Sequence, residues 1–171
     1  MYPHVQSFIT EDSTQHYTQQ YEYYHALLFQ LLDSPVKSTQ HIGGTKHFNY
    51  PTEPILDILV GVNNLHDITA LDEKRLNYAG FYRLHHAYHK KVVMAQFNNL
   101  VDLKQHVRLH IIQHHTPTFE QYIAVDTLLH NDKAAIAFFN QQKQALAQPP
   151  TTIRAYETYK QQLFSQLYTM L

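Results

Sequence analysis

The sequence predicts an α+β protein in which about five strands form a mixed or antiparallel sheet with an N-terminal helix, one crossover helix and C-terminal helices. Three observations support this prediction. Apolar side chains recur every three or four positions from Tyr17 to Leu31, which indicates an amphipathic helix. Residues 55–62 are apolar apart from one acid, as in a strand that is covered on both faces. Residues 117–146 carry two further helical patterns bounded by prolines.

The elements follow one another with recognisable start and stop signals. The predicted strands are 37–42, 55–62, 81–84, 91–97 and 107–112. The predicted helices are 17–31, one between Asn64 and Gly80, 116–131, 132–146 and a last one after Thr152. Gly43 and Gly44 supply a turn between the first two strands, and Thr116 and Asp132 can cap helices. No internal linker is long enough to separate two units, so residues 1–171 are assigned to a single domain.

Composition excludes several classes of function. A formal net charge of -1 gives no overall reason to expect nucleic acid or an anionic membrane as a partner. The absence of cysteine excludes disulfides, thiolate metal sites and cysteine nucleophiles. The first residues lack a basic start followed by an apolar stretch, and no run approaches the roughly 18 apolar residues of a membrane span. We therefore expect a cytoplasmic protein that is neither exported by a standard signal nor embedded in a membrane.

Asp57 lies alone inside the apolar segment 55–62. A buried carboxylate costs several kcal/mol unless it is hydrogen-bonded, paired with a cation or bound to a metal. Asp57 is therefore either part of an active site at the end of a strand or a satisfied structural acid. Gly43 and Gly44 leave the same choice open, because two glycines suit both a tight turn and a close approach of backbone amides to phosphate.

Several separated blocks of the sequence resemble the GrpB family, small relatives of the nucleotidyltransferase superfamily. In chain order they are "HIGGT", "EPILDILV", "LNYAGFYR", "LHII", "VDTLL", "FNQQKQALA" and "YETYK". The resemblance spans nearly the whole chain, and it is specific because the blocks agree in order and spacing. It implies a minimal nucleotidyltransferase fold in which a strand after a glycine-rich turn bears a metal-binding acid.

The resemblance also implies a set of site residues. Asp57 would hold Mg²⁺, the only cofactor expected, and Arg108 or His110 would stabilise charge or move a proton. The residues expected at phosphates are Gly43, Gly44, Thr45, Lys143 and Lys160. The implied ligand is a nucleoside triphosphate or another small anion, and the implied reaction is a metal-dependent nucleotidyl or phosphoryl transfer.

Departures from the family pattern argue against two-metal catalysis. Strand side chains alternate, so residue 59 projects from the same face as Asp57, and it is Leu59 where a second carboxylate is usual. The segment 107–112 offers Arg108 and His110 on one face and no acid. Asp126 matches its family block, whereas both arginines of that block are missing. Whether the chain is an enzyme therefore stays open, and the alternative is a non-catalytic member that binds a small anion or a protein.

Histidine is abundant, with 14 residues, yet the spacing does not suit zinc. His106, His110 and His114 would be separated by about 13 Å along a strand, too far apart for ligand distances of about 2 Å. We expect no zinc, haem or disulfide. The aromatic first helix leaves a dimer interface open as an alternative to its simpler role of covering the sheet.

Overall fold

The computed structural model describes residues 16–31, 34, 36–48, 53–64, 70–84, 91–97, 104–146, 162 and 166. Its helices and strands are, in chain order, α1 (His16–Gln30), β1 (Val36–Ile42), α2 (Gly44–His47), β2 (Leu56–Val62), α3 (Ala70–Tyr78), β3 (Tyr82–Arg83), β4 (Val92–Phe97), β5 (Gln105–Gln113), α4 (Pro117–Asn131) and α5 (Lys133–Leu146). Of the last predicted helix, after Thr152, only residues 162 and 166 are described, and both are helical; the rest of that prediction lies outside the described residues. None of the described helices is long and apolar enough to span a membrane.

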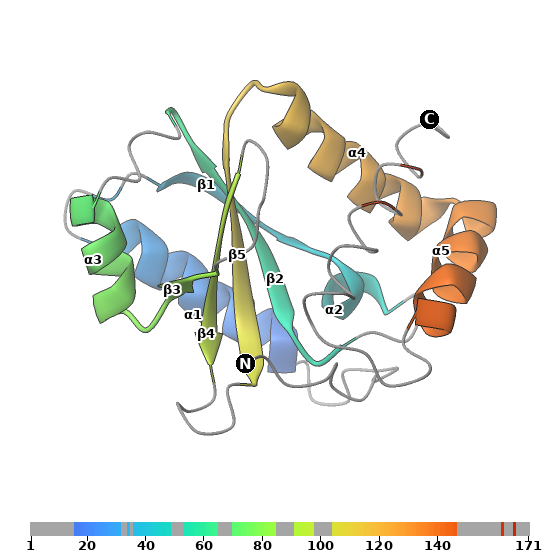
Figure 1. The fold of residues 1–171 in the computed structure, drawn as a ribbon, viewed down its shortest axis with the longest axis horizontal. Helices are drawn as coiled ribbons and strands as arrows, with labels where there is room; N and C mark the ends of the chain where they lie inside the picture. The colour runs from blue at the N-terminus through green and yellow to red at the C-terminus, as the bar shows by residue number, and fades with distance from the viewer. Residues whose placement is uncertain are drawn as a thin grey trace.

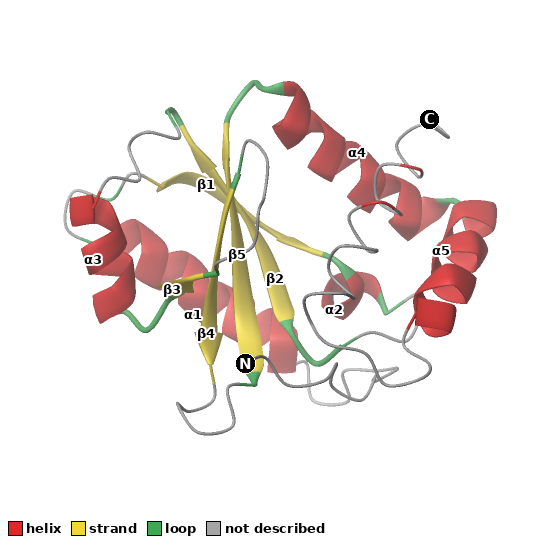
Figure 2. Ribbon diagram, viewed as in Figure 1, coloured by secondary structure: helices red, strands yellow, loops and turns green. Residues whose placement is uncertain are grey.

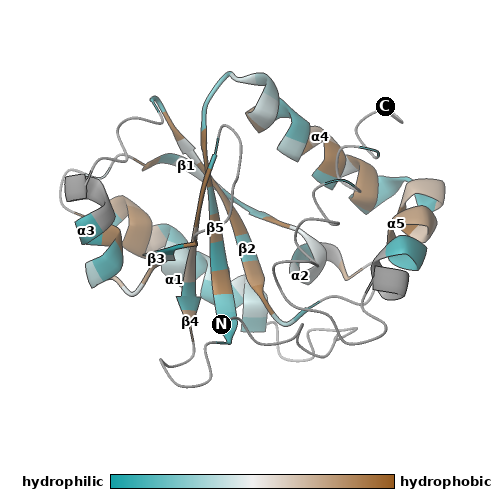
Figure 3. Cartoon of the chain, viewed as in Figure 1, coloured by the Kyte–Doolittle hydropathy of each residue, from teal (hydrophilic) through white to brown (hydrophobic). Residues whose placement is uncertain are grey.

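The five strands form one mixed sheet in the order β1-β2-β5-β4-β3. β2 and β5 are parallel neighbours, and the other three pairs are antiparallel. Helices lie on both sides of this sheet, with α1 packed against one face and α4 against the other (Figure 1; Figure 2). Hydrophobic residues line β2, and hydrophobic and hydrophilic residues alternate along β5 (Figure 3). The predicted α+β class and the mixed sheet of about five strands are confirmed.

Alternation along β2 divides the interior into two parts. Leu56, Ile58 and Val60 belong to the main core together with residues of α1. Leu59 points the other way and packs with Tyr122 of α4. We call the side of the sheet that carries Asp57, Leu59, Arg108 and His110, beneath α4, the α4 face. The near-continuous apolar run of β2 is therefore explained by burial on both of its faces.

A short helix follows β1, where the sequence predicts only a turn. Gly43 has φ 81° and stands at the N-cap of α2, which covers four residues from Gly44. A positive φ is easy for glycine and strained for other residues, which explains why the chain has glycine at this position. The helix was missed because four residues are too few to show an apolar period.

Capping residues define the ends of the C-terminal helices. The Thr116 hydroxyl accepts a hydrogen bond from the Phe119 N–H at the start of α4, and Pro117 occupies the first turn. The Asp132 carboxylate accepts from the Ala135 N–H and caps α5 in the same way. Both predicted caps are confirmed. They fix where α4 and α5 begin.

Gly61 in β2 makes room for a contact between its two neighbouring strands. A Cβ atom at this position would lie 1.9 Å from His114 Nε2 and 2.5 Å from Ser38 Oγ. These two side chains are hydrogen-bonded to each other at 2.6 Å across the glycine. The glycine is thus required because side chains from both sides meet above the middle strand.

Candidate functional site

Asp57 lies at the centre of a polar cluster on the α4 face. It pairs directly with Arg108 in the parallel register of β2 and β5. His110 Nε2 lies 2.9 Å from Asp57 Oδ1, and Arg108 Nε lies 4.0 Å from the same oxygen. Arg108 is only 2% exposed, and its Nε donates to Gln105 Oε1 at 3.0 Å. The structure therefore brings the three predicted residues Asp57, Arg108 and His110 together.

The imidazole of His110 is held in a neutral state by its surroundings. Burial lowers the pKa of His110 below its ordinary value of 6.5, and the nearby positive charges of Lys91 and Arg108 lower it further. The hydrogen bond and the charge of Asp57 act in the opposite direction and are outweighed. A neutral imidazole that donates from Nε2 to the carboxylate satisfies this geometry.

Gly43 lies against this cluster from the β1 side. A Cβ atom on Gly43 would lie 3.1 Å from Asp57 Oδ2, so the glycine lets the turn approach the carboxylate closely. The Gly43 N–H donates to Asp126 Oδ1 at 2.9 Å, and Lys46 Nζ lies 3.6 Å from Asp126 Oδ2. The sequence predicts that the Gly43 amide binds phosphate, but in the structure this amide is hydrogen-bonded to the carboxylate of Asp126 in α4. Burial raises the pKa of Asp126, while the Gly43 amide and Lys46 oppose that rise.

The remaining predicted phosphate-binding residues are placed differently. Gly44 begins α2, and the buried Thr45 hydroxyl is hydrogen-bonded to His41 Nε2 at 3.1 Å. The Thr45 side chain therefore connects α2 to β1 through this hydrogen bond. Lys160 lies outside the described residues, and so does the side chain of Lys143, whose backbone belongs to α5. The expected role of these two lysines remains a prediction.

The donor set does not suit a metal pair. Arg108 places a positive charge 4.0 Å from Asp57 Oδ1, which disfavours a cation at that oxygen. Leu59 is buried on the same face, where a second carboxylate would be needed. In the part of the chain that the structure describes, no three His, Asp or Glu side chains come close enough together to share a metal ion. Two of the histidines considered for zinc have other partners, Gln96 for His106 and Ser38 for His114.

Four residues near the cluster were given no role from the sequence. They are Lys46, Lys91, Tyr122 and Asp126. Asp126 could have been found, because its family block, "VDTLL", keeps the acid while losing both arginines. The three others carry no local signal, because their positions depend on how α4 and the turn pack on the sheet.

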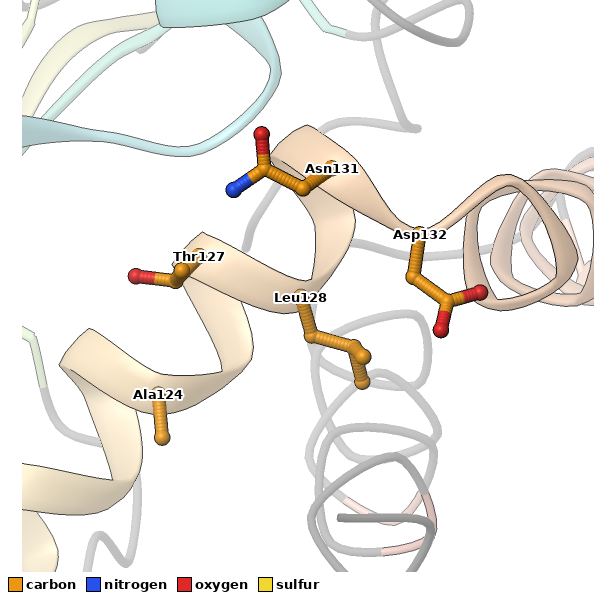
Figure 4. A pocket seen from close by; sticks show the side chains of 5 residues that line it. All are labelled: Ala124, Thr127, Leu128, Asn131 and Asp132. Carbon is orange, nitrogen blue, oxygen red and sulfur yellow. The ribbon is translucent and has the colours of Figure 1, made fainter.

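A concavity on the surface lies away from these residues. It is lined by Ala124, Thr127, Leu128, Asn131 and Asp132 (Figure 4). These residues come from the side of α4 that faces away from the sheet and from the junction with α5. None of the predicted site residues lines it, so the concavity is separate from the α4 face.

The lowered pKa of His110 leads to a prediction about stability and pH. A histidine that stays neutral in the folded state takes up a proton only on unfolding, so its contribution is present above pH 6.5 and is lost as the pH falls below that value. The loss approaches about 1.4 kcal/mol per pH unit for one proton. We expect the free energy of unfolding of the wild type to fall between pH 7 and pH 5 more steeply than that of His110→Gln. Denaturant titrations across this range measure the difference, and parallel curves would contradict the prediction.

Comparisons with known proteins agree with this fold. The family model described as GrpB protein matches residues 9–170. The Glutamate-rich protein GrpB of Alkalihalophilus pseudofirmus is 28% identical over 144 residues, which are 83% of each chain. The crystal structure of conserved protein GrpB from Enterococcus faecalis matches with a TM-score of 0.70 and 19% identity, over 99% of this chain and 98% of that one. A structure of the Cid1 poly(U) polymerase matches more weakly, with a TM-score of 0.47 and 13% identity, over 88% of this chain and 50% of that one. The family match covers nearly the entire sequence, and the chain belongs to the GrpB family.

Proposed function

We propose that this chain binds a phosphate-bearing small molecule, of the nucleoside triphosphate class, directly on the α4 face and without a catalytic metal pair. One observation carries the proposal: Arg108 lies 4.0 Å from Asp57 Oδ1 and His110 is hydrogen-bonded to the same oxygen, so the charge of Asp57 is compensated by Arg108 within the chain. A carboxylate in this state orients two basic side chains. The guanidinium of Arg108 is suited to phosphate oxygens.

The glycine turn supports the same proposal. Gly43 approaches Asp57 closely, and its amide is bonded to an anionic group, the carboxylate of Asp126. A phosphate that enters along the turn would compete with that carboxylate for the Gly43 N–H. Metal-dependent nucleotidyl or phosphoryl transfer is the alternative function, and it requires Asp57 to exchange its present contacts for Mg²⁺.

Ligand-induced stabilisation distinguishes the two functions. We expect ATP, CTP and inorganic phosphate to raise the melting temperature in EDTA. At a ligand concentration of one hundred times Kd, binding would stabilise the folded state by about 2.7 kcal/mol. Asp57→Asn should keep this shift, because it removes a negative charge that opposes the anion while keeping an acceptor for His110. The measurement is differential scanning fluorimetry with and without Mg²⁺, with sodium chloride matching the ionic strength.

Other outcomes of this experiment contradict the proposal. A shift that requires Mg²⁺ and disappears in Asp57→Asn would favour the metal-dependent transferase. If the wild type shows no shift with any of the nucleotides or phosphate, in EDTA or in Mg²⁺, neither function holds for this face.

A further inference from the structure

A serine and a histidine meet across the middle of three adjacent strands, at the end of β2 away from Asp57. Ser38 Oγ, from β1, lies 2.6 Å from Nε2 of His114, which comes just after β5. Both side chains are half-buried, so solvent reaches the pair. Ser38 pairs with Gly61 of β2, which lies four residues after Asp57 and therefore about 13 Å further along the strand. The pair is thus separate from the candidate phosphate site.

Two irregularities of the sheet bring these side chains together. The register of β1 with β2 shifts between Val36 and Ser38, and such bulges re-aim side chains and are frequent beside active sites. A regular register continued from Val36 would point Ser38 to the other face. Gly61 has no side chain, and a Cβ there would lie 1.9 Å from His114 Nε2 and 2.5 Å from Ser38 Oγ. Any side chain at position 61 would therefore displace the pair.

His114 is held in place through both its backbone and its ring. Its N–H donates to the Val62 carbonyl at 2.8 Å, which extends the ladder between β2 and β5 by one residue. Its ring stands edge-to-face against Phe119 in the first turn of α4, with the ring centroids 4.9 Å apart. These contacts fix the direction in which Nε2 faces Ser38, as a general base requires.

We propose that Ser38 is a nucleophile and His114 its general base in the transfer of an acyl group from an uncharged, activated carboxylic ester. A serine hydroxyl within hydrogen-bond reach of a histidine nitrogen is the arrangement that activates this weak nucleophile. With its hydrogen on Nδ1, His114 accepts the Ser38 proton at Nε2. The groups that meet here are a hydroxyl, an imidazole and the ring of Phe119, which suit an uncharged ester better than a phosphate.

The reaction balances with water as the second substrate. Ser38 Oγ forms a bond to the carbonyl carbon while its proton passes to His114 Nε2. The bond to the leaving alcohol breaks, and the alcohol takes that proton. Water then attacks the acyl-serine and gives a proton to His114, which returns it to Ser38 as the carboxylic acid leaves. None of the residues of the proposed phosphate site takes part, so this inference goes beyond the proposed function.

The test mixes the full chain with 4-nitrophenyl acetate, an activated ester whose coloured alcohol is measured as it leaves. We expect an acetyl group on Ser38, mapped by peptide mass spectrometry after acid quenching, together with release of 4-nitrophenolate. Ser38→Ala should abolish the release that depends on Ser38. His114→Gln should slow acetylation of Ser38 at least about a hundredfold, because general bases contribute this much. His115→Asn is the matched control: it removes the neighbouring exposed imidazole, tolerates the φ of 59° and should react as the wild type does.

Each outcome either supports or overturns the assignment. Acetylation of Ser38 that is slowed in His114→Gln and unchanged in His115→Asn supports it. Acetyl groups found only on lysines or the N-terminus, or wild-type release by Ser38→Ala, overturn it. Unchanged acetylation of Ser38 in His114→Gln, or equal slowing in His115→Asn, shows that His114 is not the base and also overturns it. Circular dichroism verifies that each variant is folded, and Ser38→Ala decides the question if His114→Gln does not fold.

Discussion

Asp57→Ala is expected to destabilise the protein by about 3 kcal/mol, the lower end of the cost of removing one member of a buried ion pair, because the Asp57 side chain is 15% exposed. The substitution removes the carboxylate that faces the buried Arg108 guanidinium and accepts from His110 Nε2. It therefore leaves positive charge and a polar ring in an interior that water does not reach easily. Chemical denaturation with urea, followed by circular dichroism, measures the change in the free energy of unfolding.

Asp57→Asn is the matched control for this prediction. Asparagine has nearly the same shape and keeps a carbonyl oxygen as acceptor for His110, but it carries no charge. We expect a loss of about 1–3 kcal/mol, smaller than that of the alanine variant. If both variants unfold at the wild-type urea concentration, the cluster contributes nothing to stability, and Asp57 would have to be retained for another reason.

Most of the fold could be predicted from the sequence because its elements have strong local patterns. The long apolar segment of β2 and the period of α1 are visible without any tertiary information. The caps of α4 and α5 were readable from Thr116 and Asp132. What local patterns do not contain is the pairing of strands, and the parallel register of β2 with β5 became known only from the structure.

The candidate site was predictable to the extent that it depends on single strands. Alternation places Arg108 and His110 on one face of β5, and the structure puts Asp57 on the same face of β2. The contacts of Lys91 and Asp126 depend instead on how α4 crosses the sheet. An amphipathic pattern shows which side of a helix is buried, but not which neighbours it meets. The residues on β2 and β5 are therefore predictable from the sequence, whereas the contacts that α4 makes with them are not.

Gly43→Ala is expected to disturb the candidate site directly. Gly43 has φ 81°. A residue with a side chain adopts this backbone conformation only under strain, which costs about 1–3 kcal/mol of stability. The new Cβ would also lie 3.1 Å from Asp57 Oδ2, so the turn or the carboxylate must move. We expect both lower stability in urea and loss of the melting shift that phosphate or nucleotide produces.

Gly80→Ala separates these two effects. Gly80 also has a positive φ, of 98°, and a Cβ there would meet Gln96 Nε2 at 2.8 Å, which is the end of a flexible side chain. This variant should lose a similar amount of stability, because the backbone strain is of the same kind. It should keep the ligand-induced shift, because it lies after α3 and does not touch Asp57. If Gly43→Ala also keeps the full shift, the turn only shapes the backbone, and a ligand would have to be bound by the basic side chains alone.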